Sequence, residues 1–314
     1  MAYLNVLGVP HAYQLTPQTE KTSVTLVFIH GWLLSQGYWQ PVIDCLPSNF
    51  RCLSYDLRGF GESNQQLEAR SLTPASKPAA SMPHPYSLEA YAEDLGALLT
   101  ALDLQTPVWL VGHSLGGSVA LWAAKLWPQQ VQGVICVNAG GGVYLPDEFA
   151  RFRQAGEQIV RWRSPWLRNV PFVRWAFARL MVFEPLALAW GKQRVADLLA
   201  AHPEAAKGVL LESTTEAEVH RLPQVVANLQ RPAYFLAGAE DTVMEVKYVK
   251  HLASFHPLFE SAEGNVRVLP NCGHMAMLEQ PVALAQAIQD LAIALPASTP
   301  PASPPSRDSA RLGG

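Results

Sequence analysis

Charged residues, cysteines and long apolar runs are all scarce in this chain of 314 residues. Only 16% of the residues are charged, below the quarter that is usual in soluble domains, whereas 49% are hydrophobic. This balance indicates that part of the surface is apolar. The formal net charge of −3, without a long basic or acidic block, gives no general attraction for nucleic acid. We therefore expect no nucleic-acid partner.

The four cysteines show neither the C-x-x-C spacing of a zinc or redox site nor the density of a disulfide scaffold, so we expect reduced thiols. The first residues carry no basic leader followed by a cleavage site. No apolar run reaches the roughly 18 residues that a membrane-spanning helix needs. These absences predict a cytoplasmic protein, either soluble or bound peripherally to a membrane.

Short runs rich in β-branched and aromatic residues recur along the chain, and most are nearly all apolar, as expected for strands buried on both faces. They lie at 24–29, 51–55, 108–111, 131–137, 233–237 and 265–269. Helical patterns lie between them, most clearly at 87–102, where Ser87 is a candidate N-cap. The alternation predicts an α/β fold with a mostly parallel central sheet flanked by helices.

One connection between strands is much longer than the others. It spans nearly a hundred residues, has helical character and contains no strong strand, which indicates a cap inserted into the sheet domain. The predicted parts are a first core segment at 1–142, a helical cap at 143–230, a second core segment at 231–295 and a tail at 296–314. The tail and a loop at about 65–85 are rich in Pro, Ala and Ser, and we expect both to be disordered.

A nucleophile motif occurs where a strand is predicted to turn into a helix. The segment Gly112-His113-Ser114-Leu115-Gly116 matches the pattern G-x-S-x-G directly after the apolar run at 108–111. The sharp turn strains the serine backbone, and the small residues Gly112 and Gly116 avoid a clash at this nucleophile elbow. The turn also exposes the side chain beside the first free amides of the next helix. Ser114 is therefore the predicted nucleophile.

A serine hydroxyl needs a base within hydrogen-bond reach, and the base needs a third group to orient it. His274 follows the run at 265–269, in a loop at the carboxyl end of the sheet, where it would hang over the serine. His251 and His256 lie within or at the end of a helical stretch and suit packed or solvated positions better. We predict His274 as the base, against the alternative that it only stabilises its own loop.

Two adjacent acids, Glu240 and Asp241, follow the run at 233–237 and compete for the third position. Asp241 begins a helical stretch and by itself would be interpreted as an N-cap. The chain order Ser, Asp, His is the one associated with a strand–serine–helix turn, and it favours Asp241 as the acid.

The same reaction needs preorganised donors for an oxyanion. The sequence offers the backbone amide of Leu115 and, from the loop after 24–29, that of Trp32. The Trp32 indole could equally form a pocket wall or belong to the core.

These residues make the chain resemble the α/β-hydrolase superfamily, in particular its cap-bearing, serine-dependent esterase, lipase and haloperoxidase-like branches. The resemblance covers about 24–140 and 230–294. A serine at position 114 differs from the aspartate nucleophile of the dehalogenase and epoxide hydrolase branches. Asn138 stands where some members place their acid, which favours Asp241. Further motifs are His30-Gly31-Trp32, which resembles the oxyanion loop, the glycine-bearing turn Tyr55-Asp56-Leu57-Arg58-Gly59-Phe60-Gly61-Glu62-Ser63, the helix start Tyr86-Ser87-Leu88, and the histidine loop with Gly273, His274, Glu279 and Pro281.

Within the predicted cap, 151–179 holds seven arginines against the single acid Glu157. They are interleaved with large aromatic residues, namely Trp162, Trp166, Phe172, Trp175 and Phe177. In one interpretation the aromatic residues pack the cap onto the core while the arginines face water. In the other, this segment lies at the headgroup region of an anionic membrane.

The predicted activity is hydrolysis of a carboxylic ester, expected to be lipophilic, through an acyl-enzyme formed on Ser114. No metal and no organic cofactor are implied. Alternatives that keep the same triad are carbon–carbon bond hydrolysis, a lyase such as the menaquinone-pathway synthase, and cofactor-free perhydrolase or haloperoxidase-like chemistry. A non-catalytic binding protein is disfavoured by the intact triad residues. The sequence indicates no particular oligomeric state.

Overall fold

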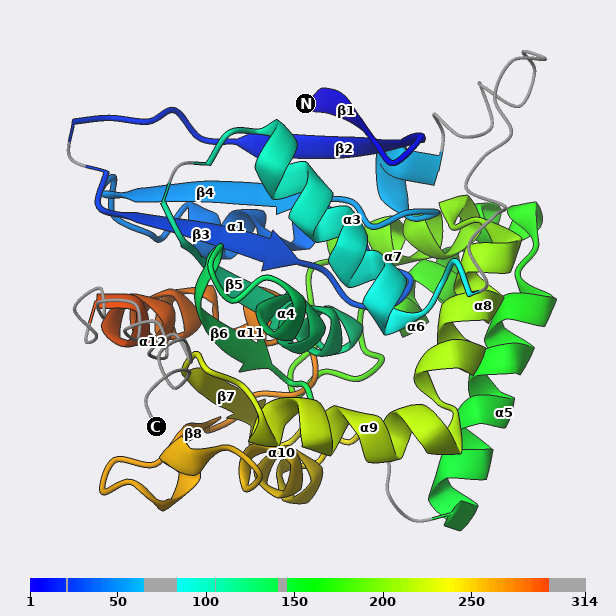
Figure 1. The fold of residues 1–314 in the computed structure, drawn as a ribbon. Helices are drawn as coiled ribbons and strands as arrows, with labels where there is room; N and C mark the ends of the chain where they lie inside the picture. The colour runs from blue at the N-terminus through cyan, green and yellow to red at the C-terminus, as the bar shows by residue number, and fades with distance from the viewer. Residues whose placement is uncertain (21, 65–83, 105, 141–145, 294–314) are drawn as a thin grey trace, which may run out of the picture.

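A sheet of eight strands forms the centre of the computed structural model, which describes residues 1–20, 22–64, 84–104, 106–140 and 146–293 (Figure 1). The strand order is β1-β2-β4-β3-β5-β6-β7-β8, with β1 and β2 antiparallel to their neighbours and the other pairs parallel. The strands are β1 (Ala2–Val6), β2 (Val9–Leu15), β3 (Val24–Ile29), β4 (Phe50–Tyr55), β5 (Val108–His113), β6 (Val131–Val137), β7 (Ala233–Gly238) and β8 (Val266–Leu269). The α/β fold with a mostly parallel sheet is thus confirmed.

The apolar strands supply two cores, one on each face of the sheet. In β3, Val27 and Ile29 belong to one buried cluster, whereas Leu26 and Phe28 belong to the other. This division follows from the alternation of side chains along a strand. It explains why the runs that predicted these strands are apolar at almost every position.

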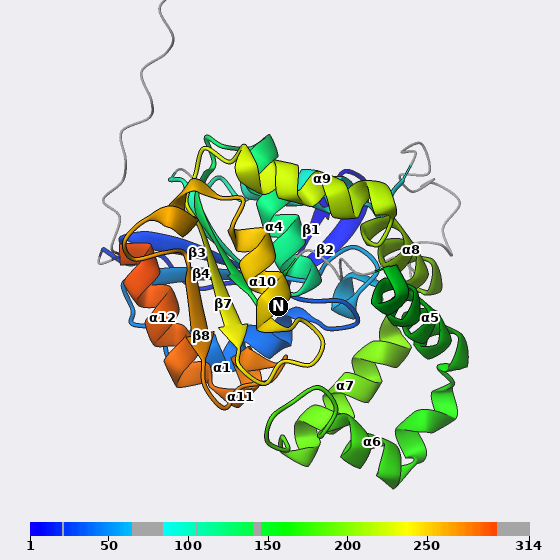
Figure 2. The ribbon, with the colours of Figure 1, turned by 90° about the horizontal axis from the view of Figure 1, so that it is seen from below.

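Helices cover both faces of the sheet, as the strand–helix alternation predicts (Figures 1 and 2). One face is covered by α3 (Leu88–Ala101), α4 (Leu115–Leu126) and α10 (Val246–Ala253). The other is covered by α1 (Gln40–Ile43), α11 (Ala276–Glu279) and α12 (Pro281–Ile293). The Ser87 hydroxyl accepts a hydrogen bond from the Ala90 amide at 3.2 Å, so it caps α3 as expected.

The described part of the long connection between β6 and β7 consists of helices joined by turns and contains no strand. Its elements are α5 (Pro146–Trp162), the 3₁₀ turn η2 (Pro165–Asn169), α6 (Pro171–Phe177), α7 (Leu188–Ala200), α8 (Pro203–Ser213) and α9 (Glu216–Ala227). Figure 1 shows α5 to α8 at the end of the sheet toward which the parallel strands point. Two helices of this connection pack on helices of the sheet domain, because α9 contacts α4 and α8 contacts α3.

One hairpin of the fold was not predicted, and two predicted segments fall largely or wholly outside the described residues. The hairpin of β1 and β2 was not predicted, because its turn is Leu7-Gly8, with Leu7 at a φ of 49°, rather than an Asn-Gly or Asp-Gly pair. The predicted disordered tail at 296–314 lies outside the described residues, and so does almost all of the loop at 65–85.

Candidate active site

Ser114 occupies the single residue between the end of β5 and the start of α4. Its backbone has a φ of 51° and a ψ of −118°, a conformation that non-glycine residues rarely adopt. The turn is too tight for a side chain two residues before or two residues after Ser114. A Cβ at Gly112 would lie 2.2 Å from the Gly116 carbonyl oxygen, and one at Gly116 would lie 2.4 Å from that of Ile29. The glycine spacing of the motif is therefore a requirement of close backbone packing.

His274 and Asp241 form a buried pair near this turn. The imidazole Nδ1 lies 2.8 Å from Asp241 Oδ2. The other carboxylate oxygen accepts hydrogen bonds from the amides of Val243 and Met244 at 2.8 and 2.9 Å. Since the carboxylate can only accept, it assigns the proton to Nδ1 and leaves Nε2 free to act as a base.

The second acid of the sequence pair does not share this environment. Glu240 is exposed, whereas Asp241 is buried. Asn138 Nδ2 donates to Asp241 Oδ2 at 2.7 Å and to the Gly273 carbonyl at 3.1 Å. Burial alone would raise the pKa of the Asp241 carboxyl. The facing His274, together with the hydrogen bonds from His274, Met244 and Asn138, outweighs burial and lowers that pKa to about 2.

Ser114 and His274 meet at the wall of one large cavity of about 600 Å³. Most of its other lining residues are apolar and come from both the core and the cap, among them Trp32, Ile159, Phe177, Leu180 and Met181. Within the described residues, Ser114 Oγ makes no hydrogen bond to the imidazole. Such a contact is often long in an unliganded enzyme and tightens when substrate binds.

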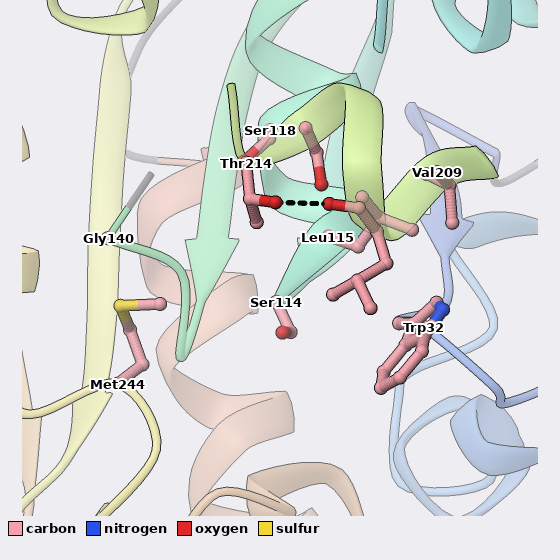
Figure 3. A pocket seen from close by; sticks show the side chains of 10 residues that line it. Trp32, Ser114, Leu115, Ser118, Gly140, Val209, Thr214 and Met244 are labelled. Carbon is pink, nitrogen blue, oxygen red and sulfur yellow. Dashed lines mark hydrogen bonds between the residues drawn. The ribbon is translucent and has the colours of Figure 1, made fainter. Parts of the chain in front are cut away.

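A smaller cavity of about 90 Å³ adjoins Ser114 on another side. Figure 3 shows Ser114 between Trp32 on one side and Gly140 and Met244 on the other, with Thr214 farther into the cavity. His274 does not line it. The serine therefore lines two cavities, and its candidate base lines only the larger one.

The two predicted oxyanion donors lie beside the serine. Leu115 is the first residue of α4, so its amide has no partner within the helix. Trp32 follows β3 and lines both cavities. Among the described residues, neither backbone amide donates a hydrogen bond. The Trp32 indole forms a pocket wall, and its Nε1 donates to the Ala206 carbonyl of α8 at 2.9 Å. It thus connects the oxyanion loop to the cap.

Two residues that hold the histidine loop were not assigned a role from the residues themselves. The Glu279 carboxylate accepts hydrogen bonds from the amides of Gly273, Met275 and Phe183 at 2.7 to 2.9 Å. His113 Nε2 lies 2.8 Å from the His274 carbonyl oxygen. Burial lowers the pKa of His113 to about 3, so this ring is neutral and donates. In the sequence, only the resemblance of the histidine loop points to Glu279. His113 occupies a variable position of the G-x-S-x-G motif, so the motif predicts no role for it.

The glycine-bearing turn after β4 is hydrogen-bonded to the segment that follows β3. Asp56 accepts hydrogen bonds from the Gln36 amide at 2.6 Å and the Glu62 amide at 2.9 Å. His30 Nε2 accepts from the Leu57 amide at 3.0 Å. The buried Arg58 and Asp94 form a bidentate ion pair at 2.9 and 2.6 Å. None of the residues at 55–63 lines the two cavities at Ser114, whereas Asp56, Gly61 and Glu62 line a separate cavity of about 470 Å³.

The other late histidines lie elsewhere. His251 is exposed on α10, and His256 is buried, with Nε2 at 3.1 Å from the Arg231 carbonyl. Neither lines the cavities that contain Ser114. In the described part of the chain, no group of three or more His, Cys, Asp or Glu side chains is arranged to hold a metal ion.

Residues 24–281 match the family described as alpha/beta hydrolase fold, and the chain belongs to this family. It is 26% identical over 269 residues to a pimeloyl-[acyl-carrier protein] methyl ester esterase of Pseudoalteromonas atlantica, covering 83% of this chain and 91% of that protein. It is 27% identical over 271 residues to a 2-succinyl-6-hydroxy-2,4-cyclohexadiene-1-carboxylate synthase of an Enterobacter species, covering 85% and 90%. A thermophilic esterase from Thermogutta terrifontis superimposes with a TM-score of 0.68 at 22% identity, covering 93% of this chain and 98% of that one.

These matches confirm the superfamily that the sequence resembles. They include both an esterase and a synthase, and this fold serves many reactions. Family membership therefore defines the fold and an α/β-hydrolase type of enzyme. The reaction and its substrate have to be argued from the site.

Proposed function

We propose that this protein is a serine hydrolase that cleaves a lipophilic carboxylic ester through an acyl-enzyme intermediate. The observation that carries the proposal is the buried Asp241–His274 pair, because its histidine lines the same apolar cavity as Ser114, which lies at a strained strand-to-helix turn. A nucleophile, a base and a group that orients the base are the three parts that this chemistry requires.

In the first half of the reaction, His274 Nε2 takes the proton of Ser114 Oγ while that oxygen bonds to the carbonyl carbon of the ester. The amides of Trp32 and Leu115 stabilise the negative charge on the carbonyl oxygen, and Asp241 stabilises the imidazolium. The imidazolium then gives its proton to the alcohol oxygen as the carbon–oxygen bond breaks. Water repeats the sequence on the acyl-enzyme and releases the acid.

The position of the base indicates how the ester is seated. The leaving alcohol oxygen has to reach His274, and His274 lines the large cavity but not the small one. We therefore place the alcohol part in the cavity of about 600 Å³, whose volume is typical of sites for drug-sized molecules. Its apolar lining supports a lipophilic alcohol, and the acyl part is placed on the side of the small cavity.

A serine-directed fluorophosphonate probe tests the proposal. The wild-type protein and a Ser118→Ala variant should be labelled, because Ser118 also lines the small cavity but lies one turn into α4. Ser114→Ala should not be labelled and should lose ester hydrolysis in a screen of acyl chains and alcohols that includes isoprenoid alcohols. Labelling and hydrolysis that persist in purified Ser114→Ala protein would refute the mechanism.

The same screen tests the seating of the ester. With a fixed acetyl group, kcat/KM should rise as the alcohol becomes longer and more apolar. If kcat/KM depended only on acyl length, the assignment of the two cavities would be reversed while the serine mechanism remained.

A second candidate function uses the same three residues for a different bond. It is favoured by the similarity to the Enterobacter synthase, which extends over most of both chains. Carbon–carbon cleavage, elimination and perhydrolysis each leave products different from an acid and an alcohol. Product identification by mass spectrometry, with and without added hydrogen peroxide, separates these reactions from ester hydrolysis.

A further inference from the structure

Among the described side chains at 151–179, four large aromatic residues face solvent. Trp162 is 74% exposed, Trp166 60%, Phe172 69% and Trp175 45%. They come from the end of α5, from η2 and from α6, and Figure 2 shows α6 at the outer edge of the molecule. Aromatic residues that serve to pack a cap onto a core would be buried. Exposed apolar side chains gathered in this way indicate a surface that contacts a partner.

The arginines of the same segment divide into two groups. Arg153 donates to the Thr214 carbonyl at 3.1 Å, and Arg163 donates to the carbonyls of Leu198 and Ala201, so both hold the cap together. The other five are exposed, and within the described residues none of them forms an ion pair with a carboxylate. This exposed group comprises Arg151, Arg161, Arg168, Arg174 and Arg179.

Aromatic and cationic side chains contact each other on α6 and in the turn that follows it. The Arg179 guanidinium lies 3.9 Å from the centre of the Trp175 ring, and the rings of Trp175 and Phe172 are stacked at 5.7 Å. The only acid between 151 and 179 is Glu157. We call the four exposed aromatic residues, together with the exposed Arg161, Arg168, Arg174 and Arg179, the cap patch. Its charge complements an anionic surface, and its aromatic rings suit the boundary between water and hydrocarbon.

We infer that the cap patch docks onto an anionic lipid bilayer, with its aromatic rings in the headgroup region and its arginines on the lipid phosphates. Exposed arginines keep the charged head in water while the stem contacts apolar groups, as this arrangement requires. No helix in the described part of the chain is long and apolar enough to cross a bilayer. The contact is therefore peripheral, and it depends on electrostatic attraction together with insertion of aromatic rings.

The cap patch adjoins the large cavity at Ser114. Ile159 on α5 is 42% exposed and Leu180, just after α6, is 45% exposed, and both also line this cavity. Docking would thus place an apolar entrance beside the lipid, from which a lipophilic molecule could reach the serine. This step rests on the proposed function, whereas binding to the bilayer does not.

The test is co-flotation of the full-length protein with vesicles of phosphatidylcholine alone and of equal parts phosphatidylcholine and phosphatidylglycerol, at low and high salt. We expect binding to the anionic vesicles only, weakened by salt because the contributing charges are exposed. The variant Arg161→Gln/Arg168→Gln/Arg174→Gln should bind roughly fivefold more weakly for each arginine removed. Trp162→Ala/Trp166→Ala should reduce binding even at low salt.

A matched control removes the same charge outside the cap, as Lys125→Gln/Lys250→Gln/Arg267→Gln, and should bind like the wild type. Ser114→Ala should also bind, so a failure of the enzymatic proposal would not be confused with a failure of docking. Unchanged near-ultraviolet circular dichroism checks that the variants are folded. Equal binding to both kinds of vesicle, or an equal loss of binding in the control variant, would overturn the inference. It would also be overturned if the patch mediated dimerisation in analytical sedimentation and the protein bound no vesicles.

Discussion

Replacing Asp241 by Asn tests the proposed triad with the smallest change in shape. In the wild type, Oδ1 accepts from two backbone amides, and Oδ2 faces His274 Nδ1 and Asn138 Nδ2. The new amide must keep its oxygen toward the backbone N–H groups, because its NH₂ cannot accept from them. The NH₂ group then faces His274 and can only donate.

This reversal changes the tautomer of the imidazole. His274 Nδ1 has to accept the new hydrogen bond, so the proton moves to Nε2, the atom that should take the proton of Ser114. The same NH₂ group also meets the NH₂ of Asn138, which leaves one donor without an acceptor. The matching substitution in a serine protease lowers kcat by about four decades, equivalent to about 5.4 kcal/mol of activation free energy. We expect a loss of this order, with little change in KM.

The assay is steady-state hydrolysis of a chromogenic ester, with kcat and KM measured for both variants of the acidic pair. Glu240→Gln is the control, because its side chain is exposed and adjacent in sequence. It should retain near wild-type kcat. A loss of less than tenfold in Asp241→Asn, or equal losses in the two variants, would refute the assignment of Asp241.

Three further predictions concern the candidate triad, the histidine loop and a buried carboxyl of α7. Ser114→Ala and His274→Ala should each abolish most turnover, and the double variant should be little worse than either; multiplicative losses would show that the residues act independently. Glu279→Gln places an NH₂ group against backbone amides that now donate to the carboxylate, so kcat should fall by about a hundredfold as the histidine loop shifts, and an unchanged kcat would contradict its positioning role. Asp197 is a buried residue of α7 and accepts a hydrogen bond from the Ser35 hydroxyl at 3.3 Å. Burial raises the pKa of its carboxyl to about 6 from 3.8. The contribution of this carboxyl to the free energy of unfolding is therefore complete below pH 3.8. It is lost as the pH rises through about 6, which lowers the free energy of unfolding by up to about 3 kcal/mol. Urea titrations at the two ends of this range should show the decline in wild type but not in Asp197→Asn, and an equal decline in both would exclude Asp197 as its source.

The strands were predictable because burial on both faces leaves almost every position apolar. In β5, all six residues are buried, and no periodicity was needed to find it. The β1–β2 hairpin at the edge lacks this signal, since β1 is mostly exposed and its turn uses Leu7 in a left-handed conformation. Strand β1 depends on pairing with β2, which its own residues do not report.

Part of the candidate site could be predicted from the sequence, because short sequence patterns identify the residues that this chemistry requires. The turn at Ser114 requires glycines at fixed spacing, and the histidine and acid follow strands that end at the same edge of the sheet. Other contacts join segments that are far apart in the chain. Asn138, after β6, donates to Asp241, after β7, and Glu279 at the end of α11 accepts from the amide of Phe183.

The sequence by itself thus determined the class of fold, and it predicted Ser114, Asp241 and His274 as catalytic residues and a helical cap. These inferences depend on short-range patterns: apolar runs, a turn that requires glycine at two positions, and the order of residues along the chain. Only the tertiary structure shows that Asp241 and not Glu240 faces His274, that two arginines of the cap bond to backbone carbonyls while five are exposed, and that His274 lines the larger of the two cavities at Ser114. Each of these depends on which side chains meet across the cap and core, and that is set by packing between segments distant in sequence.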